Sequence, residues 1–197
     1  MLDLHRLELH RRALRQSVDL VDLIGDDQWA LPTPCAEWDL RQLVEHMTLD
    51  NRGFAAAAGG ERADTAVWSA RDFGPDLRAE YARSAERVVA AFRSPAPEFW
   101  LPRITPDTTF AADRAIGFHL LDYLAHGWDV AAATGRPVDY PADLVAAVQE
   151  IADRDVPNGP NRLRAGASFR PALPAQPDES ALDHLLRTLG RSPSWPG

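Results

Sequence analysis

The sequence predicts an all-α protein built as a helical bundle, and three observations lead to this prediction. Apolar residues recur at intervals of three and four along several segments, which is the period of an amphipathic helix. Residues that favour helix ends, namely Asp, Ser, Pro and Gly, stand at the boundaries of these segments. No segment alternates apolar and polar residues convincingly enough to predict a half-buried strand.

The first two expected helices have well-defined ends. One covers residues 2–24, and Gly25 is its expected stop because glycine adopts the left-handed cap conformation without strain. The apolar residues of this helix follow one face: Leu4, Leu7, Leu14, Val18 and Val21. The second helix follows Asp39, an N-cap whose capping-box partner is Gln42, and it ends near residues 59–60.

Two further helices complete the expected bundle. After a loop over residues 61–75, Pro75 opens the third helix, because the first turn of a helix tolerates the missing N–H of proline. Prolines interrupt residues 94–107, which we expect to form a loop with one short extended piece. The fourth helix covers residues 109–134 and ends at Gly135.

We expect a single domain in two parts. Residues 1–135 form a four-helix bundle, and residues 136–197 form a C-terminal extension that packs on it. The extension contains helices over 143–153 and 180–189, and an irregular segment rich in Pro, Gly and Arg over 156–177.

Charge and apolar content exclude several classes of protein. The net charge of −8 disfavours a nucleic-acid-binding protein, which needs a basic surface to neutralise phosphates. No uncharged apolar run is long enough for a transmembrane helix, so we expect no membrane partner. The start of the chain lacks the apolar region of a signal peptide, and the single cysteine, Cys35, suits a reducing compartment. These features predict a cytoplasmic protein.

The basic residues have an unusual composition, because all 21 are arginine and the chain contains no lysine. The absence of lysine excludes Schiff-base catalysis and a P-loop. Abundant arginine and alanine agree with GC-rich codons, so we expect a high-GC bacterial source.

Titratable residues form a constellation on the fourth expected helix. His119, Asp122, His126 and Asp129 are spaced three, four and three apart, which places them on one helix face. Asp122 and His126, one turn apart, can bind one metal ion together. A third ligand must come from another helix. His46 is the best candidate because it lies at the edge of the apolar face of the second helix, where bundles build their sites.

Simpler interpretations of the same residues stay open. His46 alone can be a hydrogen-bonded core histidine, and Asp122 with His126 can be an exposed ion pair. Asp129 can bond an arginine or a helix end. Four aromatic residues either line a cleft near the metal or belong to the bundle core: Trp38, Phe118, Tyr123 and Trp128. Arg52 can meet an anionic substrate or lie on the surface, and we expect Cys35 to be a small buried apolar residue.

Three segments resemble a known family. DQWALPTPCAEWDLRQLVEHMTLDN (27–51) and LAHGWDVAAATGRP (124–137) are similar to the two most specific segments of an actinobacterial metal-binding family. LDHLLRTLGRSPSW (182–195) resembles the usual C-terminal end of that family. The family belongs to the DinB-like superfamily, which includes the N-terminal domain of mycothiol-dependent maleylpyruvate isomerase. The resemblance covers nearly the whole chain.

The resemblance implies a DinB-like four-helix bundle that binds a divalent metal through three side chains. The matching positions here are His46, Asp122 and His126. The maleylpyruvate isomerase relatives carry Glu where this chain has Asp122, and Asp is shorter by one methylene, so Asp122 must approach the metal more closely. His119 can replace Asp122 or support the ligands, and Asp129 can support them as well.

Two histidines and one carboxylate leave open positions on a metal, as in catalytic sites. Zn²⁺ suits these ligands best, and Ni²⁺, Fe²⁺ and Mn²⁺ are alternatives. An open metal lowers the pKa of bound water to about 7 or binds a thiolate. The family resemblance implies that mycothiol supplies this thiolate.

Three functions remain open from the sequence. The protein is a mycothiol-dependent transferase or isomerase that acts on a small electrophile, a non-catalytic metal-binding or ligand-sensing bundle, or a structural helical protein without metal. The partners expected for the first two are a small-molecule thiol or electrophile, and the chain can form a homodimer.

Overall fold

A computed structural model describes residues 3–35, 37–62, 65–164 and 167–196. Within these residues the fold is almost entirely helical, with one small two-stranded sheet, which confirms the predicted all-α class. The α-helices are α1 (Leu4–Asp22), α2 (Leu40–Ala58), α3 (Leu77–Ala91), α4 (Ala112–Ala133), α5 (Ala142–Asp155) and α6 (Ala181–Thr188). The strands are β1 (Glu98–Trp100) and β2 (Thr109–Ala111), and two 3-10 turns are η1 (Ala66–Trp68) and η2 (Pro160–Leu163).

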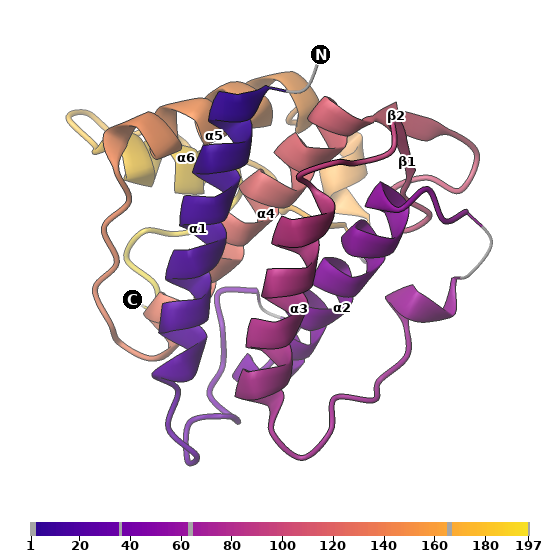
Figure 1. Ribbon diagram of the computed structural model, residues 1–197. Helices are drawn as coiled ribbons and strands as arrows, with labels where there is room; N and C mark the ends of the chain where they lie inside the picture. The colour runs from indigo at the N-terminus through magenta and orange to yellow at the C-terminus, as the bar shows by residue number, and fades with distance from the viewer. Residues whose placement is uncertain (1–2, 36, 63–64, 165–166, 197) are drawn as a thin grey trace.

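Helices α1 to α4 form the bundle, and α5 and α6 lie together on one side of it (Figure 1). Helix α1 packs mainly on α4, and α2 packs mainly on α3. Helix α4 also contacts α2 and α5, so side chains on several of its faces are buried. The division of the chain at residue 135 stays a prediction.

The start of α2 follows the sequence signals closely. The Asp39 carboxylate accepts from the backbone N–H of Gln42 at 2.8 Å, and the backbone N–H of Asp39 donates to Gln42 Oε1 at 3.0 Å. Both halves of the predicted capping box are therefore present. This start fixes which faces of α2 point toward the other helices, including the face that carries His46.

The end of the first helix and the start of the third differ from the predictions. Helix α1 ends at Asp22 with Leu23 as its C-cap, and the following Ile24 is buried in the core. The N–H of Gly25 instead bonds a side-chain oxygen of Gln28. Asp76, rather than Pro75, caps α3 by accepting from the N–H of Ala79.

The largest difference concerns the expected beginning of the fourth helix. Residues 109–111 form β2, which pairs antiparallel with β1, with Phe99 opposite Phe110. The β-branched and aromatic residues of this segment favour a strand, and the ladder with β1 prevails over helix formation. The hairpin lies against α2 and presents its connecting loop, residues 101–108, to that helix.

Candidate metal centre

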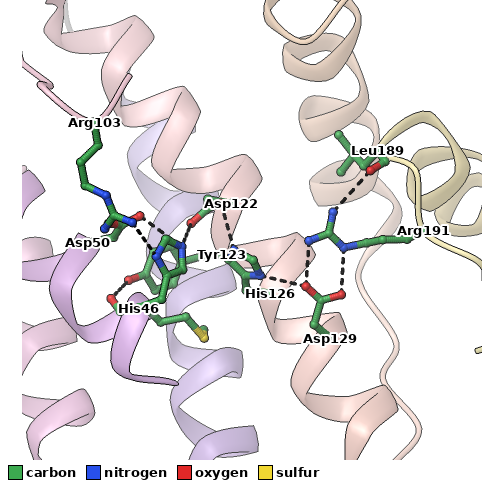
Figure 2. Close-up of polar contacts among 10 residues, drawn as sticks. His46, Asp50, Arg103, Asp122, Tyr123, His126, Asp129, Leu189 and Arg191 are labelled. Carbon is green, nitrogen blue, oxygen red and sulfur yellow. Dashed lines mark hydrogen bonds and ion pairs between the residues drawn. The ribbon is translucent and has the colours of Figure 1, made fainter. Parts of the chain in front are cut away.

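The three predicted ligands meet between α2 and α4. His46 comes from the middle of α2, and Asp122 and His126 come from the middle of α4, as Figure 2 shows. His126 Nε2 lies 3.3 Å from Asp122 Oδ1, and His46 Nε2 lies 3.9 Å from Asp122 Oδ2. The two imidazole rings are 5.1 Å apart, centre to centre.

One ligand atom from each of these three residues lies within 4.8 Å of the other two. In a tetrahedral zinc site the bonds are about 2.0–2.1 Å long, which places neighbouring ligand atoms roughly 3.3–3.5 Å apart. A small inward shift of these three side chains would therefore bring their ligand atoms to the separations found around one cation.

The chemistry of the donor set fits a divalent cation. Within the described residues, Asp122 Oδ2 is buried and has no hydrogen-bond partner. A buried carboxylate oxygen without a partner is unfavourable unless a cation or a donor reaches it. Burial opposes the charge of Asp122, but His126 outweighs that effect and lowers the pKa of Asp122 below its usual value. The carboxylate is therefore ionised and available to a metal.

His126 is held by a chain of buried contacts. Its Nδ1 donates to Asp129 Oδ2 at 2.8 Å, and Asp129 accepts two hydrogen bonds of 2.8 Å from Arg191. Burial opposes a proton on His126, but Asp122 and Asp129 together raise its pKa to about 9. In the metal-free protein this ring therefore carries a proton on Nε2 as well, facing Asp122. Because Asp129 keeps the hydrogen on Nδ1, loss of the Nε2 proton to a metal would leave the lone pair of Nε2 facing the site, as in metal-binding histidines.

His46 has different surroundings. Trp38 lies over its ring at 4.3 Å, centre to centre, and Arg103 Nη2 is 3.1 Å from its Nδ1. Burial, together with the charge of His126, lowers the pKa of His46 to about 3, so this imidazole is neutral.

Asp50, one turn after His46, is a further residue of the site that the sequence analysis missed. Its carboxylate pairs with Arg103, and its Oδ2 lies 3.5 Å from His46 Nε2. Burial raises the pKa of Asp50 to about 7, against the opposing effect of Arg103. The i, i+4 spacing from His46 could have identified Asp50, whereas Arg103 and Arg191 lie in irregular segments without a sequence signal.

Other residues singled out in the sequence lie outside this group. His119 is buried and faces α1, where its Nδ1 lies 2.9 Å from His10 Nε2. Its ring stacks on Tyr123 at 4.1 Å, so it contacts α1 and core aromatics rather than the three predicted ligands. Arg52 is held by Glu80 at 2.7 Å and by two backbone carbonyls.

The remaining candidates divide between the site and the core. Trp38 is at the site, 6.1 Å from the His126 ring as well as above His46. Tyr123 and Trp128 are buried in the core, and Phe118 packs edge-on against Phe110. Cys35 is half-buried rather than fully buried, and burial raises the pKa of its thiol to about 12.

The fold and the site together define a class of protein: a helical bundle whose two central helices bring imidazoles and carboxylates to one buried point. Comparison with known proteins gives the family. The chain belongs to the mycothiol maleylpyruvate isomerase N-terminal domain family, which matches residues 10–131. The matched region contains His46, Asp122 and His126.

Two relatives and one solved structure are similar to most of the chain. Two uncharacterized proteins of Mycobacterium tuberculosis, from strains CDC 1551 and H37Rv, are each 30% identical over 195 residues, covering 94% of this chain and 97% of the relative. A crystal structure of a mycothiol-dependent maleylpyruvate isomerase mutant superposes with a TM-score of 0.68 at 16% identity, over 95% of this chain and 89% of that one. The structural likeness confirms the predicted DinB-like bundle.

The described part of the chain contains no helix that combines the length and apolar character needed to cross a bilayer.

Proposed function

We propose that the protein binds a divalent metal through His46, Asp122 and His126 and uses mycothiol to transform a small electrophile, as a transferase or an isomerase. The observation that carries this proposal is the convergence of the three donors at Asp122, whose buried Oδ2 has no hydrogen-bond partner among the described residues. The family supports mycothiol as the thiol.

Zn²⁺ suits two imidazoles and a carboxylate best, and Ni²⁺ is an alternative. A metal held by three side chains keeps open positions, where it lowers the pKa of a thiol or water that binds there. Helix α4 supplies two of the donors one turn apart, and α2 supplies the third.

Side chains around the donors orient them and limit access of water. Asp129 fixes the hydrogen of His126 on Nδ1, so Nε2 faces the site. Arg191 holds Asp129 with two hydrogen bonds and keeps it ionised. Trp38 covers the two imidazoles on one side, so a thiol or electrophile would approach from another direction.

Elemental analysis of protein purified without an affinity tag tests the metal, and a thiol titration tests mycothiol. We expect bound metal in the wild type and none in His126→Ala. His184→Ala is the matched control, because His184 on α6 is half-exposed and pairs with Glu179 away from the site. Wild-type protein without metal affinity would contradict the proposal.

Turnover distinguishes the enzyme from the non-catalytic alternative. We expect metal-loaded protein with mycothiol to convert at least one acceptor from a panel of small electrophiles faster than the thiol alone. Bound metal without thiol affinity or turnover would favour a metal-binding or ligand-sensing bundle instead.

A further inference from the structure

We propose that Asp50 is a fourth protein ligand of the cation, and that Arg103 competes with this cation for Asp50 and for the imidazole of His46. This inference rests on the part of the proposed function that places a divalent metal between α2 and α4. It adds a residue from α2 that the three predicted ligands do not include.

The two helices are alike at the site. Helix α2 presents His46 and Asp50 one turn apart, and α4 presents Asp122 and His126 one turn apart. Each helix therefore offers one imidazole and one carboxylate to the same space, an arrangement that bundles use to build metal sites from facing helices.

The distances among these side chains suit ligands of one metal. His46 Nε2 lies 3.5 Å from Asp50 Oδ2 and 3.9 Å from Asp122 Oδ2, so one nitrogen faces both carboxylates. Neighbouring ligand atoms around a tetrahedral Zn²⁺ lie roughly 3.3–3.5 Å apart, given bonds of about 2.0–2.1 Å. The separation between Asp50 and His46 is therefore already that of two ligands on one metal.

Asp50 and His46 are more buried than Arg103. The side chains of Asp50 and His46 are each 13% exposed, whereas the Arg103 side chain is 38% exposed. Two carboxylates in one enclosed space need positive charge between or beside them. The guanidinium of Arg103 supplies it to Asp50 in this structure, and a divalent cation between the two carboxylates would supply it to both.

The tautomer of His46 shows what Arg103 does to the site. A guanidinium only donates hydrogen bonds, so Nδ1 of His46 accepts from Arg103, and Nε2 of the neutral ring carries the hydrogen. A metal at Nε2 requires that nitrogen without its hydrogen. The hydrogen must move to Nδ1, and Arg103 must leave both Nδ1 and Asp50.

His126 presents a different arrangement, because Asp129 holds a hydrogen on Nδ1 and Nε2 faces the carboxylate of Asp122 at 3.3 Å. To bind a metal, His126 therefore has only to lose the proton of Nε2, whereas His46 must also move its hydrogen from Nε2 to Nδ1 and lose its contact with Arg103. Arg103 lies in the loop between β1 and β2 and is partly in solvent, so it can withdraw while the core helices stay in place (Figure 2).

Titration of metal-free protein with Co²⁺, followed by visible absorption, tests the proposal. The absorption of bound Co²⁺ reports the number and type of its ligands, and the titration gives the affinity. We expect Asp50→Asn to weaken Co²⁺ binding about tenfold or more, since even partners of metal ligands contribute factors of 10–100. Its spectrum should differ from that of the wild type.

Two further variants complete the experiment. Arg103→Gln should tighten Co²⁺ binding about threefold, the size expected for release of one partly exposed ion pair. Glu45→Gln is the matched control: it also changes a carboxylate of α2 to an amide, next to His46, but Glu45 pairs with Arg71 away from the site. This control should leave affinity and spectrum unchanged.

The outcomes separate this inference from the proposed function. Wild-type protein that takes up no Co²⁺ would overturn the metal centre itself. If the wild type binds and Asp122→Asn does not, but Asp50→Asn matches Glu45→Gln in affinity and spectrum, then Asp50 is no ligand and the three-ligand centre stands. Weaker Co²⁺ binding in Arg103→Gln would refute competition by Arg103.

Discussion

The buried ion pair behind His126 gives the sharpest test of how the site is held. Asp129 is fully buried and Arg191 is 7% exposed, and two hydrogen bonds of 2.8 Å join them. Arg191→Met removes the guanidinium and leaves the Asp129 carboxylate without its main positive partner. Removing one partner of a buried pair costs about 3–5 kcal/mol. For a chain of this length, that loss lowers the unfolding midpoint by roughly 6–20 °C.

Thermal unfolding followed by circular dichroism measures this effect. Arg11→Met is the control, because Arg11 and Glu8 form an exposed pair on α1, and its midpoint should stay at the wild-type value. The double variant Asp129→Asn with Arg191→Met should recover much of the stability, because no unpaired charge remains buried. Equal losses in the single and double variants would refute the argument.

The substitution Arg191→Met should also weaken metal binding. Arg191 is the main group that offsets burial and keeps the pKa of Asp129 low, so its loss weakens the acceptor that fixes His126. We expect metal affinity to fall about tenfold, the lower range for partners of metal ligands. Unchanged affinity in a folded Arg191→Met protein would show that Asp129 orients His126 without help.

Three more predictions follow from the core and the site. Burial lowers the pKa of His10 to about 3 and that of His119 well below 6.5. Just below pH 6.5, therefore, these two imidazoles bind protons in the unfolded chain but stay neutral in the folded protein. The free energy of unfolding should therefore fall on acidification from pH 7 to 5 by roughly 2 kcal/mol for His10, and His119 should add to this loss. Urea titrations measure this loss, and His10→Phe should reduce it. A Cβ at Gly127 would lie 2.6 Å from a tyrosine hydroxyl. Gly127→Ala should therefore lower the free energy of unfolding in a urea titration by about 1–3 kcal/mol, whereas Gly159→Ala, in open space, should not. Zn²⁺ at 100 times its Kd should raise the free energy of unfolding by about 2.7 kcal/mol, and His126→Ala should abolish this increase.

Much of the site follows from local spacing. The pair Asp122 and His126 follows from i, i+4 geometry on one helix, and the capping box at Asp39 fixes the register that brings His46 to the facing side. The bundle then places the two imidazoles 5.1 Å apart. These features were predictable because each depends on a few neighbouring residues and on one packing contact between helices.

The contacts that spacing could not predict depend on long-range packing. Arg103 reaches His46 only because residues 109–111 pair as a strand and fold the intervening loop back onto α2. His119 shares the helix face of the site residues, but lies at the level of His10 and bonds to α1. Periodicity predicts on which face of its helix a side chain lies. The neighbouring helix at that point along the axis decides which residue the side chain contacts.

Arg191 approaches the centre from the segment after α6, 62 residues along the chain from Asp129. The family match ends at residue 131, so this arginine reaches the site from beyond the matched bundle. A change in the tail would then retune the basicity of an imidazole without touching any of the three donors. The basicity of this histidine therefore depends in part on a segment that lies outside the matched residues 10–131.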